Sequence, residues 1–471
     1  MLGAAAMMLC STLPGRSSAQ KVAAAPAPDK LVIYDIPQKA LYTHHNDDFT
    51  VRARLPGGEW RDLYEYNVRV DLDKPRDASM VTFDMATPVE VSVRKNNGDV
   101  RRVEVRPDSA GIKTRLIGST AYFTLDRPSK LSIEFDGDRL HNLHLFANPV
   151  ETNRPDPKDP NIVLFGPGIH TPPADAQGRF VIPSGKTVYI AGDALVQGTI
   201  TIRDAHDVRV VGHGIIDTPY RGFEVEGSSN VSIDGPTVIN PTHYTLECGQ
   251  STGLRVHNIK SFSAGSWTDG IDLMSCSDVE IDDVFLRTSD DSIAIYGHRF
   301  KFDGDARNYT ITNSTLWADV AHPINIGLHG NDKAPEVIEN ITFRNLDILG
   351  HDEDDRNYQG VMAITDGDNN LVRNILFDDI RIDSIEEGML FNIRAVFNEK
   401  YSLAPGRGVR NVMLRNIRFK GGDVNRSVVA GYAADRTVSG VTLRNVTIAG
   451  QPLRREDIDI GPYVEGLTVK P

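Results

Sequence analysis

The hexapeptide NVSIDG at residues 230–235 sets two apolar side chains two positions apart, just before a turn-forming residue. Related hexapeptides recur along the chain at spacings of 23 to 37 residues: DVRVVG from Asp207, GLRVHN from Gly253, DVEIDD from Asp278, NYTITN from Asn308, NITFRN from Asn340, NILFDD from Asn374, NVMLRN from Asn411 and GVTLRN from Gly440. A repeat of this length, rich in β-branched residues, is what a stack of flat β-coils requires, because each coil buries its inner face against its neighbours. The sequence therefore predicts a right-handed parallel β-helix. The alternative, a second antiparallel sandwich, would show hairpin turns and no constant register between copies.

A second strand accompanies the repeats, and its register predicts which side chains face outward. The segments YTLECG, GIDLMS, SIAIYG and PINIGL superpose through the apolar pairs Leu246/Cys248, Ile271/Leu273, Ile293/Ile295 and Ile324/Ile326. Two positions before these pairs lie Tyr244, Asp269, Asp291 and His322. Neighbouring coils lie ~4.8 Å apart, so these four side chains should form one outward column, with Asp290 beside Asp291.

Three carboxylates in one small region point to acid–base chemistry. A single aspartate at a coil corner commonly caps backbone groups, but stacked like charges repel and raise the pKa of one member. Glycoside hydrolysis uses such a set, because one protonated carboxyl donates to the leaving oxygen while an ionised partner activates water. We therefore expect Asp269, Asp290 and Asp291 to be catalytic.

The motifs WTDGID (267–272), SDDSIAIY (289–296) and AHPINIG (321–327) resemble the active-site strips of two enzyme families. They are similar to glycoside hydrolase family 28, the polygalacturonases, and still more to family 49, the dextranases and isopullulanases. The second family also has a β-sandwich before its β-helix. The resemblance implies that Asp290 is the general acid, that Asp269 and Asp291 position the attacking water, and that the anomeric carbon is inverted. His322 falls where the polygalacturonases keep a histidine.

The same resemblance bears on the substrate. Polygalacturonases follow their histidine with an Arg-Ile-Lys strip that grips the uronate carboxylate, and no such triplet follows His322. The nearest basic residues, Arg299 and Lys301, lie in an insertion. We therefore expect a neutral α-glucan such as dextran or pullulan, with a uronide as the alternative. Further candidates for substrate binding, besides His322, are Tyr244, Glu247, Trp267, Asp272, Tyr296, His298, Asn325 and His329.

The part of the chain before the repeats has a different pattern. Short alternating runs between Lys30 and Pro149, separated by Gly, Asp, Asn and Pro, predict an antiparallel β-sandwich. The segment ETNRPDPKDPN at 151–161 cannot continue a strand pattern. We therefore expect a sandwich domain over 21–155 and a β-helix catalytic domain over 156–471.

The first twenty residues place a short apolar run before small residues, as a secretory signal does. Cleavage near Ala19 or Gln20 would make the protein secreted or periplasmic. Cys10 would leave with the signal, and Cys248 and Cys276 remain. These two could pair, although two buried thiols are the commoner case.

Composition narrows the partners. The formal charge is −13, which argues against nucleic acid or an anionic membrane, because such partners need a basic face. A polysaccharide substrate fits this charge better. We expect the protein to be a monomer or a weak oligomer. We expect no cofactor and no metal, because the acidic run HDEDDR at 351–356 lacks the spacing of a calcium loop. The rivals are a polysaccharide lyase or epimerase, or a non-catalytic glycan-binding protein, on the same fold.

Overall fold

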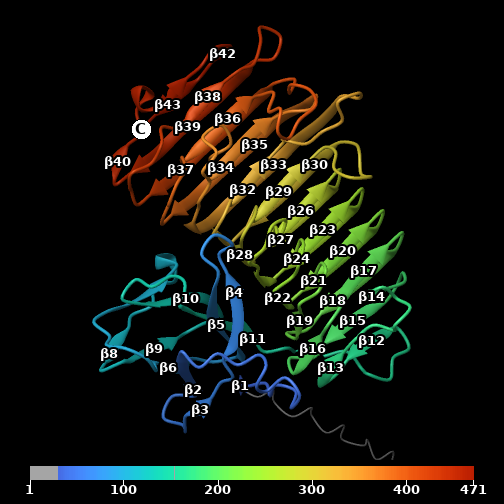
Figure 1. Cartoon of the computed structure of the whole chain (residues 1–471), viewed down its shortest axis with the longest axis vertical. Helices are drawn as coiled ribbons and strands as arrows, with labels where there is room; N and C mark the ends of the chain where they lie inside the picture. The colour runs from blue at the N-terminus through green and yellow to red at the C-terminus, as the bar shows by residue number, and fades with distance from the viewer. Residues whose placement is uncertain (1–29, 153) are drawn as a thin grey trace, which may run out of the picture.

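The computed structural model describes residues 30–152 and 154–471, which form an almost purely β-stranded molecule (Figure 1). The expected signal at 1–20 and the start of the proposed sandwich domain at 21 lie outside the described residues. Within the described part, the helical elements are two single turns of 3-10 helix, Asp108–Ala110 and Arg455–Asp457. None of the described helices is long and apolar enough to cross a membrane.

The N-terminal strands form two sheets that face each other across an apolar core, at the lower left of Figure 1. One sheet contains β1 (Leu31–Val32), β4 (Tyr66–Val70), β5 (Arg76–Met85), β7 (Val103–Arg106), β10 (Ser129–Phe135) and β11 (Leu143–Pro149). The other contains β2 (Phe49–Arg54), β3 (Arg61–Asp62), β6 (Val89–Lys95), β8 (Arg115–Ile117) and β9 (Thr120–Leu125). Phe49, Val51 and Ala53 alternate with polar residues along β2 and are buried, as a half-buried strand requires. The sandwich is antiparallel except where β11 pairs with β5 in parallel.

The rest of the chain winds into the predicted parallel β-helix, which rises as stacked rungs in Figure 1. One face is an eleven-stranded parallel sheet made of β14 (Arg179–Val181), β17 (Thr199–Arg203), β20 (Phe223–Glu226), β23 (Leu246–Gly249), β26 (Ile271–Met274), β29 (Ile293–Tyr296), β32 (Ile324–Ile326), β34 (Met362–Asp366), β36 (Phe391–Ala395), β38 (Val428–Ala430) and β41 (Asp459–Ile460). All the strand pairs of this sheet are parallel. The copies therefore cannot belong to a second antiparallel sandwich.

The other faces form a single twenty-one-stranded sheet. Its strands are β12 (Ile162–Phe165), β13 (Gly168–His170), β15 (Thr187–Ile190), β16 (Ala194–Val196), β18 (His206–Val211), β19 (Ile215–Asp217), β21 (Ser229–Asp234), β22 (Thr237–Ile239), β24 (Thr252–His257), β25 (Lys260–Phe262), β27 (Ser277–Asp282), β28 (Phe285–Thr288), β30 (Ala306–Thr312), β31 (Thr315–Ala318), β33 (Glu336–Gly350), β35 (Asn370–Ile382), β37 (Val409–Phe419), β39 (Val438–Ile448), β40 (Gln451–Pro452), β42 (Val464–Glu465) and β43 (Thr468–Lys470). The repeated hexapeptides fall in β18, β21, β24, β27, β30, β33, β35, β37 and β39.

The hexapeptides begin with Asn, Asp or Gly for a steric reason. The first residue of every copy, from Asp207 to Gly440, has φ between 52° and 70°. This left-handed region is open to glycine and tolerated by Asn and Asp, whereas other side chains clash with the backbone there. The asparagines also stack, as when Asn374 Nδ2 donates to Asn340 Oδ1 at 3.0 Å. One residue type therefore both turns the chain and joins successive coils.

The two parts of the chain share a buried interface. Phe146 of β11 packs against Phe262 and Phe285 of the β-helix, with ring centroids 5.8 and 5.2 Å apart. The buried guanidinium of Arg287 in β28 donates to Asn142 Oδ1 at 2.9 Å, across the interface. The domain boundary proposed at residue 155 falls between the last strand of the sandwich and β12, and remains a proposal.

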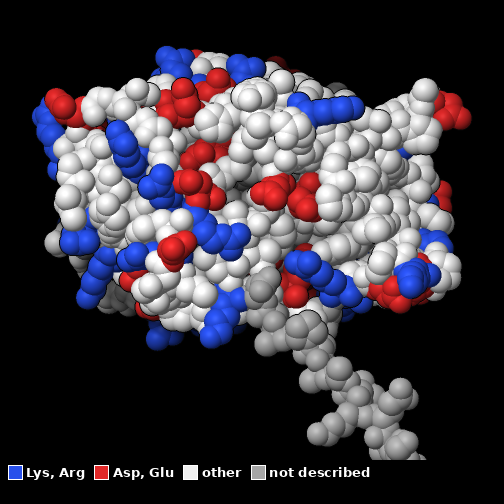
Figure 2. All heavy atoms as spheres, turned by 90° about the horizontal axis from the view of Figure 1, so that it is seen from below, with Lys and Arg blue, Asp and Glu red and all other residues white. Residues whose placement is uncertain are grey.

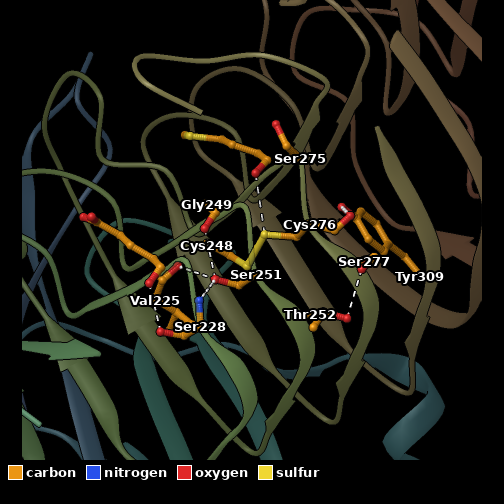
Figure 3. Close-up of a disulfide and its surroundings, with 12 residues drawn as sticks. Val225, Ser228, Cys248, Gly249, Ser251, Thr252, Ser275, Cys276, Ser277 and Tyr309 are labelled. Carbon is orange, nitrogen blue, oxygen red and sulfur yellow. Dashed lines mark hydrogen bonds between the residues drawn. A yellow bond between two sulfur atoms is a disulfide. The ribbon is translucent and has the colours of Figure 1, made fainter. Parts of the chain in front are cut away.

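A disulfide joins Cys248 of β23 to Cys276, just after β26 (Figure 3). The expectation of two buried thiols is therefore wrong. The two strands are neighbours in the sheet, and the Cα atoms lie 6.7 Å apart, within the range that a disulfide spans. The sequence separation of 28 residues did not predict that the two cysteines are close, because it equals one coil plus a short offset of three residues beyond Leu273, the partner of Cys248.

Charged groups are mixed on the surface. Figure 2 shows Lys and Arg interspersed with Asp and Glu over one face, where the described residues form no continuous basic stripe. A nucleic-acid partner would need such a stripe; that no nucleic acid binds stays a prediction.

Candidate active site

The register expected for the second strand is confirmed. Leu246 pairs with Ile271, Ile271 with Ile293, and Ile293 with Ile324 along the eleven-stranded sheet. Just before these strands, backbone hydrogen bonds join Thr245 to Asp269 O, Gly270 to Asp291 O and Ser292 to His322 O, at 2.7–2.8 Å. Tyr244, Asp269, Asp291 and His322 therefore stand on successive coils as one column.

A cavity of about 540 Å³ lies over this column. Seven of the expected residues line it: Tyr244, Trp267, Asp269, Asp290, Asp291, Tyr296 and His329. A larger hollow of about 690 Å³ lies on the N-terminal sandwich, beside Trp60 and Tyr122. Of its two carboxylates, Glu90 is already paired with Arg54, which leaves Asp126 alone. The smaller cavity on the β-helix brings three carboxylates together, so the chemistry favours it.

The carboxylates of Asp269, Asp290 and Asp291 come together in this cavity, each with an oxygen within 4.8 Å of the others. Asp290 is the most exposed of the three. Its carboxylate accepts the backbone N–H of Trp267 at 3.1 Å and that of Asp291 at 3.1 Å. Burial and the neighbouring charge of Asp291 raise the pKa of Asp290 to about 6. Asp290 therefore keeps its proton in mildly acidic solution, as a general acid must.

Asp291 has the opposite character, because donors surround it. Oδ1 accepts the backbone N–H of His322 at 3.1 Å and its Nδ1–H at 2.7 Å. Oδ2 accepts the amide of Asn325 at 2.6 Å. Burial alone would raise the pKa of Asp291, but the charge and hydrogen bonds of His322 outweigh it and lower the pKa. Asp291 is therefore the ionised member of the cluster.

His322 is a charged partner of Asp291. Its Nε2 lies 2.7 Å from the backbone carbonyl of Tyr358, and its Nδ1 lies 2.7 Å from the Asp291 carboxylate. Both neighbours accept hydrogen bonds, so both ring nitrogens carry a proton. Burial would lower the pKa of His322, but Asp291 raises it to about 9. The imidazolium and the carboxylate form a buried ion pair.

Asp269 and Asp272 are neutral, because they lack the positively charged partner that keeps Asp291 ionised. Burial, followed by the charges of neighbouring carboxylates, raises the pKa of both groups well above the ordinary value. Neither oxygen of Asp272 has a hydrogen-bond partner among the described residues. With Asp291 ionised beside it, Asp269 retains its proton and can donate it in a hydrogen bond.

Several residues expected to touch the sugar lie below the cavity floor instead. Glu247, Asp272, His322 and Asn325 are 0–2% exposed and do not line the cavity. Glu247 is paired with Arg221 at 3.0 Å, and burial raises its pKa to about 7. Asn325 donates to Asp291 and to the Tyr358 hydroxyl, at 2.6 Å each. The expectation that these four residues contact the sugar directly is therefore wrong. His322 and Asn325 hold Asp291 instead, and Glu247 is bound to Arg221.

The two loop histidines differ. His329 lines the cavity against the Tyr296 ring, with centroids 5.0 Å apart. Burial and nearby Arg299 lower the pKa of His329 to about 3, so the ring is neutral. His298 does not line the cavity, which corrects its expected place in the site.

Four lining residues were absent from the expected set: Arg299, Tyr358, Lys400 and Tyr401. Arg299 follows β29, Tyr358 lies between β33 and β34, and the last two follow β36. The lengthened repeat spacings did indicate insertions at these places, but a repeat register says nothing about where an inserted side chain points. In the sequence, Arg299 is recognisable only as a basic residue near the motif SDDSIAIY.

The cluster could also accommodate a hard cation, because carboxylate oxygens are the ligands that calcium and magnesium prefer. The donor set has only three side chains, fewer than the six to eight oxygens usual for calcium. The expectation of no metal stays a prediction, which activity in a chelator would check.

Comparison with known proteins gives the family. The sequence model of the glycosyl hydrolases family 28 matches residues 186–459, more than half of the chain. Polygalacturonase QRT2 from Arabidopsis thaliana is 24% identical over 193 residues, 39% of this chain and 39% of that protein. Endopolygalacturonase D from Aspergillus niger is 22% identical over 364 residues, 75% of this chain and 66% of that protein. Both matches cover less than two thirds of the relative's own length.

A solved structure extends the likeness to the whole fold. Dex49A from Penicillium minioluteum superposes with a TM-score of 0.58 at 14% identity, over 91% of this chain and 92% of that chain. This agrees with the resemblance to family 49 in layout, as the sequence match agrees with the resemblance to the polygalacturonases. By the match over residues 186–459, the chain belongs to the glycosyl hydrolases family 28.

Proposed function

We propose that the protein hydrolyses glycosidic bonds of a polysaccharide, with Asp290 as general acid and Asp291 as general base. One observation carries the proposal: two adjacent carboxyls in one cavity have pKa values pushed in opposite directions. Such a separation supports these roles for the acid and the base, because a site needs one protonated and one ionised group at the same pH.

The reaction follows from these states. Asp290 gives its proton to the glycosidic oxygen as the bond to the anomeric carbon breaks. A water held between Asp269 and Asp291 attacks that carbon and passes a proton to Asp291. The His322 imidazolium keeps Asp291 ionised until that moment, and Asp269 fixes the water by a hydrogen bond. One water is consumed, and one new hydroxyl forms on each product.

We propose that the anomeric carbon is inverted. Inverting enzymes usually separate acid and base by about 6.5–9.5 Å, whereas one oxygen from each of the three carboxylates here lies within 4.8 Å of the others. Two carboxyl oxygens that are both hydrogen-bonded to one water at O···O distances of ~2.8 Å lie about 4.6 Å apart. The short spacing therefore supports a shared water between Asp269 and Asp291. The separation between Asp290 and Asp291 is shorter than the usual range for inverting enzymes.

For the substrate, we propose a uronide in preference to a neutral glucan. Arg299 and Lys400 line the cavity. In the described part of the chain, Arg299 contacts His329 and the Trp267 ring, and Lys400 lies over the Tyr401 ring, with no carboxylate paired to either. The buried Nε of Arg299 lacks a hydrogen-bond partner in the described chain. A guanidinium in this state suits a carboxylate, which it binds through charge-assisted hydrogen bonds. The polygalacturonase relatives support the same choice. In this chain, inserted segments supply the basic groups that polygalacturonases carry on the strand after their histidine.

The experiment compares polygalacturonate, its methyl ester, dextran and pullulan, with reducing ends, ultraviolet absorbance and product anomers measured together. Hydrolysis of polygalacturonate with inverted products is expected. Initially retained anomers would contradict the shared-water mechanism, and an unsaturated chromophore would indicate a lyase. Preferential cleavage of dextran or pullulan would show that the substrate is a neutral glucan.

Arg299 gives a sharper test of the uronide. We expect Arg299→Met to lower kcat/KM on polygalacturonate by about 10-fold or more, because a hydrogen bond to a charged group contributes about 1.5–3 kcal/mol. The methyl ester, which lacks the charge, is the matched control and should lose much less. Equal losses on both polymers would show that Arg299 shapes the cavity without reading the carboxylate.

We also propose that the protein works outside the cytoplasm. The disulfide Cys248–Cys276 supports this, because disulfides persist in oxidising compartments. The expected signal sequence would serve the same route.

A further inference from the structure

The insertion at 297–305, between β29 and β30, folds back across the outer face of the eleven-stranded sheet. Lys301 Nζ lies 2.5 Å from Glu226 Oε2 of β20, and β20 is three strands before β29 in the sheet order. Coils spaced ~4.8 Å apart make this reach about 14 Å. Between these ends, Gln250 Nε2 donates to the backbone carbonyl of Asp303 at 2.9 Å.

Phe302 seals the middle of this cover. Its ring is 3% exposed and lies over Gly249 of β23. A Cβ on Gly249 would meet the ring at 2.3 Å, so the close approach requires glycine at that position. The backbone at Gly249 and the ring of Phe302 are therefore in direct contact, with no room for a sugar between them.

Outward side chains on the strands beside this cover are also buried. Glu224, Glu247 and Asp272 pair in register along β20, β23 and β26, at the outward position of each strand. Outward side chains of an open groove would be solvated, yet these three are 0–2% exposed. The groove therefore does not continue past Asp269 toward the N-terminal coils.

Two other insertions wall the opposite side. The rings of Tyr358 and Tyr401 have centroids 5.2 Å apart, and Tyr401 lies 6.4 Å from His329 on the cavity wall. The Tyr401 segment is tied down where Ser402 Oγ donates to Leu328 O at 3.1 Å and where the Asp368 carboxylate accepts the backbone N–H of Ala404 at 2.9 Å. Both walls are held by contacts to the coils beneath them.

We propose that the site accepts one end of a glycan chain and releases short products from that end, in place of cutting within the chain. The proposal rests on the proposed function and adds its mode of action. A long chain bound inside a groove must leave the catalytic carboxylates in both directions along the sheet, and here insertions close both. The cavity of about 540 Å³ has the size of a small-molecule pocket.

The first experiment follows products and viscosity during hydrolysis of long polygalacturonate. We expect one short product, a monomer or dimer, from the earliest times, while viscosity falls little for each bond cut. Early release of oligomers of many lengths, with a steep loss of viscosity, would overturn the proposal.

The second experiment opens the N-terminal wall. In Lys301→Ala/Phe302→Ala we expect longer products to emerge and viscosity to fall faster per bond cut. Arg255→Ala, which breaks the exposed Arg255–Glu280 pair at 3.2 Å elsewhere on the β-helix, is the control and should keep the wild-type pattern. Melting temperatures identify an unfolded variant. A folded double variant with unchanged products would show that the insertion does not limit the chain.

A binding measurement separates this proposal from the proposed function. With Asp290→Asn, calorimetry on polygalacturonate of decreasing mean length counts binding sites per gram. Halving the length should double the capacity if chain ends bind, whereas internal binding leaves the capacity constant. If chain ends bind but the wild type does not hydrolyse the polymer, the proposed hydrolase function is wrong and the end-binding pocket stands. If the capacity is constant and the wild type hydrolyses the polymer, the end-binding pocket is wrong and the hydrolase function stands.

Discussion

Asp290 and Asp291 are adjacent in the chain, yet their carboxyl groups meet different surroundings. Burial, followed by the neighbouring charge of Asp291, raises the pKa of Asp290 to about 6, although its carboxylate accepts two backbone N–H groups that favour the ionised form. Asp291 receives the imidazolium of His322 and the amide of Asn325, so its pKa falls. Hydrogen-bond donors placed by the next coil therefore decide which carboxyl is the acid.

Replacing the acid is the direct test at this scale. We expect Asp290→Asn to lower kcat by about 10²–10⁴-fold, which is what a positioned general acid contributes. The amide is nearly isosteric, so the melting temperature and the affinity for substrate should change little. Turnover at the wild-type rate would favour a non-catalytic cluster or another active site.

The pH dependence should report both carboxyls. Hydrolysis needs Asp291 ionised and Asp290 protonated, so kcat/KM should fall as pH drops through the lowered pKa of Asp291 and as pH rises through about 6. In His322→Gln the positive charge that lowers both pKa values is lost. Both limbs should then move to higher pH.

His206→Gln is the matched control, because His206 is exposed beside Asp207 and away from the cavity. It should leave both limbs in place. A uniform loss of activity in His322→Gln, without movement of either limb, would mean that His322 supports packing and does not set the charge of Asp291.

At the scale of elements, the first residue of each repeated hexapeptide carries the turn. Asn374 has φ of 59° and sits in a stack between Asn340 and Asn411. Asn374→Ala loses the stack and forces an alanine into the left-handed region, whereas Asn374→Gly loses only the stack. We expect the alanine variant to be less stable than the glycine variant by about 1–2 kcal/mol. Thermal unfolding measures the difference, and equal stabilities would show that the stack matters more than the turn.

The strands could be predicted because their signal is periodic. Leu246, Ile271 and Ile293 mark the inner face by residue type alone, and one register then placed Tyr244, Asp269 and Asp291 in a column. The insertions carry no such period. Tyr358 and Lys400 enter the cavity, and Phe302 covers Gly249, through contacts between segments that are far apart in sequence. The Cys248–Cys276 pair depended on an offset between coils that the repeat spacing does not specify.

At the scale of the molecule, the sandwich and the β-helix depend on each other. Arg287, fully buried in β28, donates to Asp319 at 2.8 and 3.0 Å within the β-helix. It also donates to Asn142 Oδ1 and to the backbone carbonyl of Arg139, each at 2.9 Å, in the sandwich. Its guanidinium lies 3.8 Å over the ring of Trp317. One side chain therefore satisfies polar groups from both parts of the chain.

Removing this charge should weaken the whole molecule. Arg287→Met leaves Asp319 buried without its partner, which costs about 3–5 kcal/mol for a broken buried pair. Arg287→Met/Asp319→Leu removes both charges and should regain much of that loss, because a buried ion pair is often no more stabilising than apolar residues of similar size. Calorimetry measures the melting temperatures, and limited proteolysis of the 150–161 segment reports opening between the parts. If the double variant melts no higher than the single one, the loss of stability comes from the Asn142 and Arg139 contacts, which both variants lack, and not from the unpaired charge of Asp319.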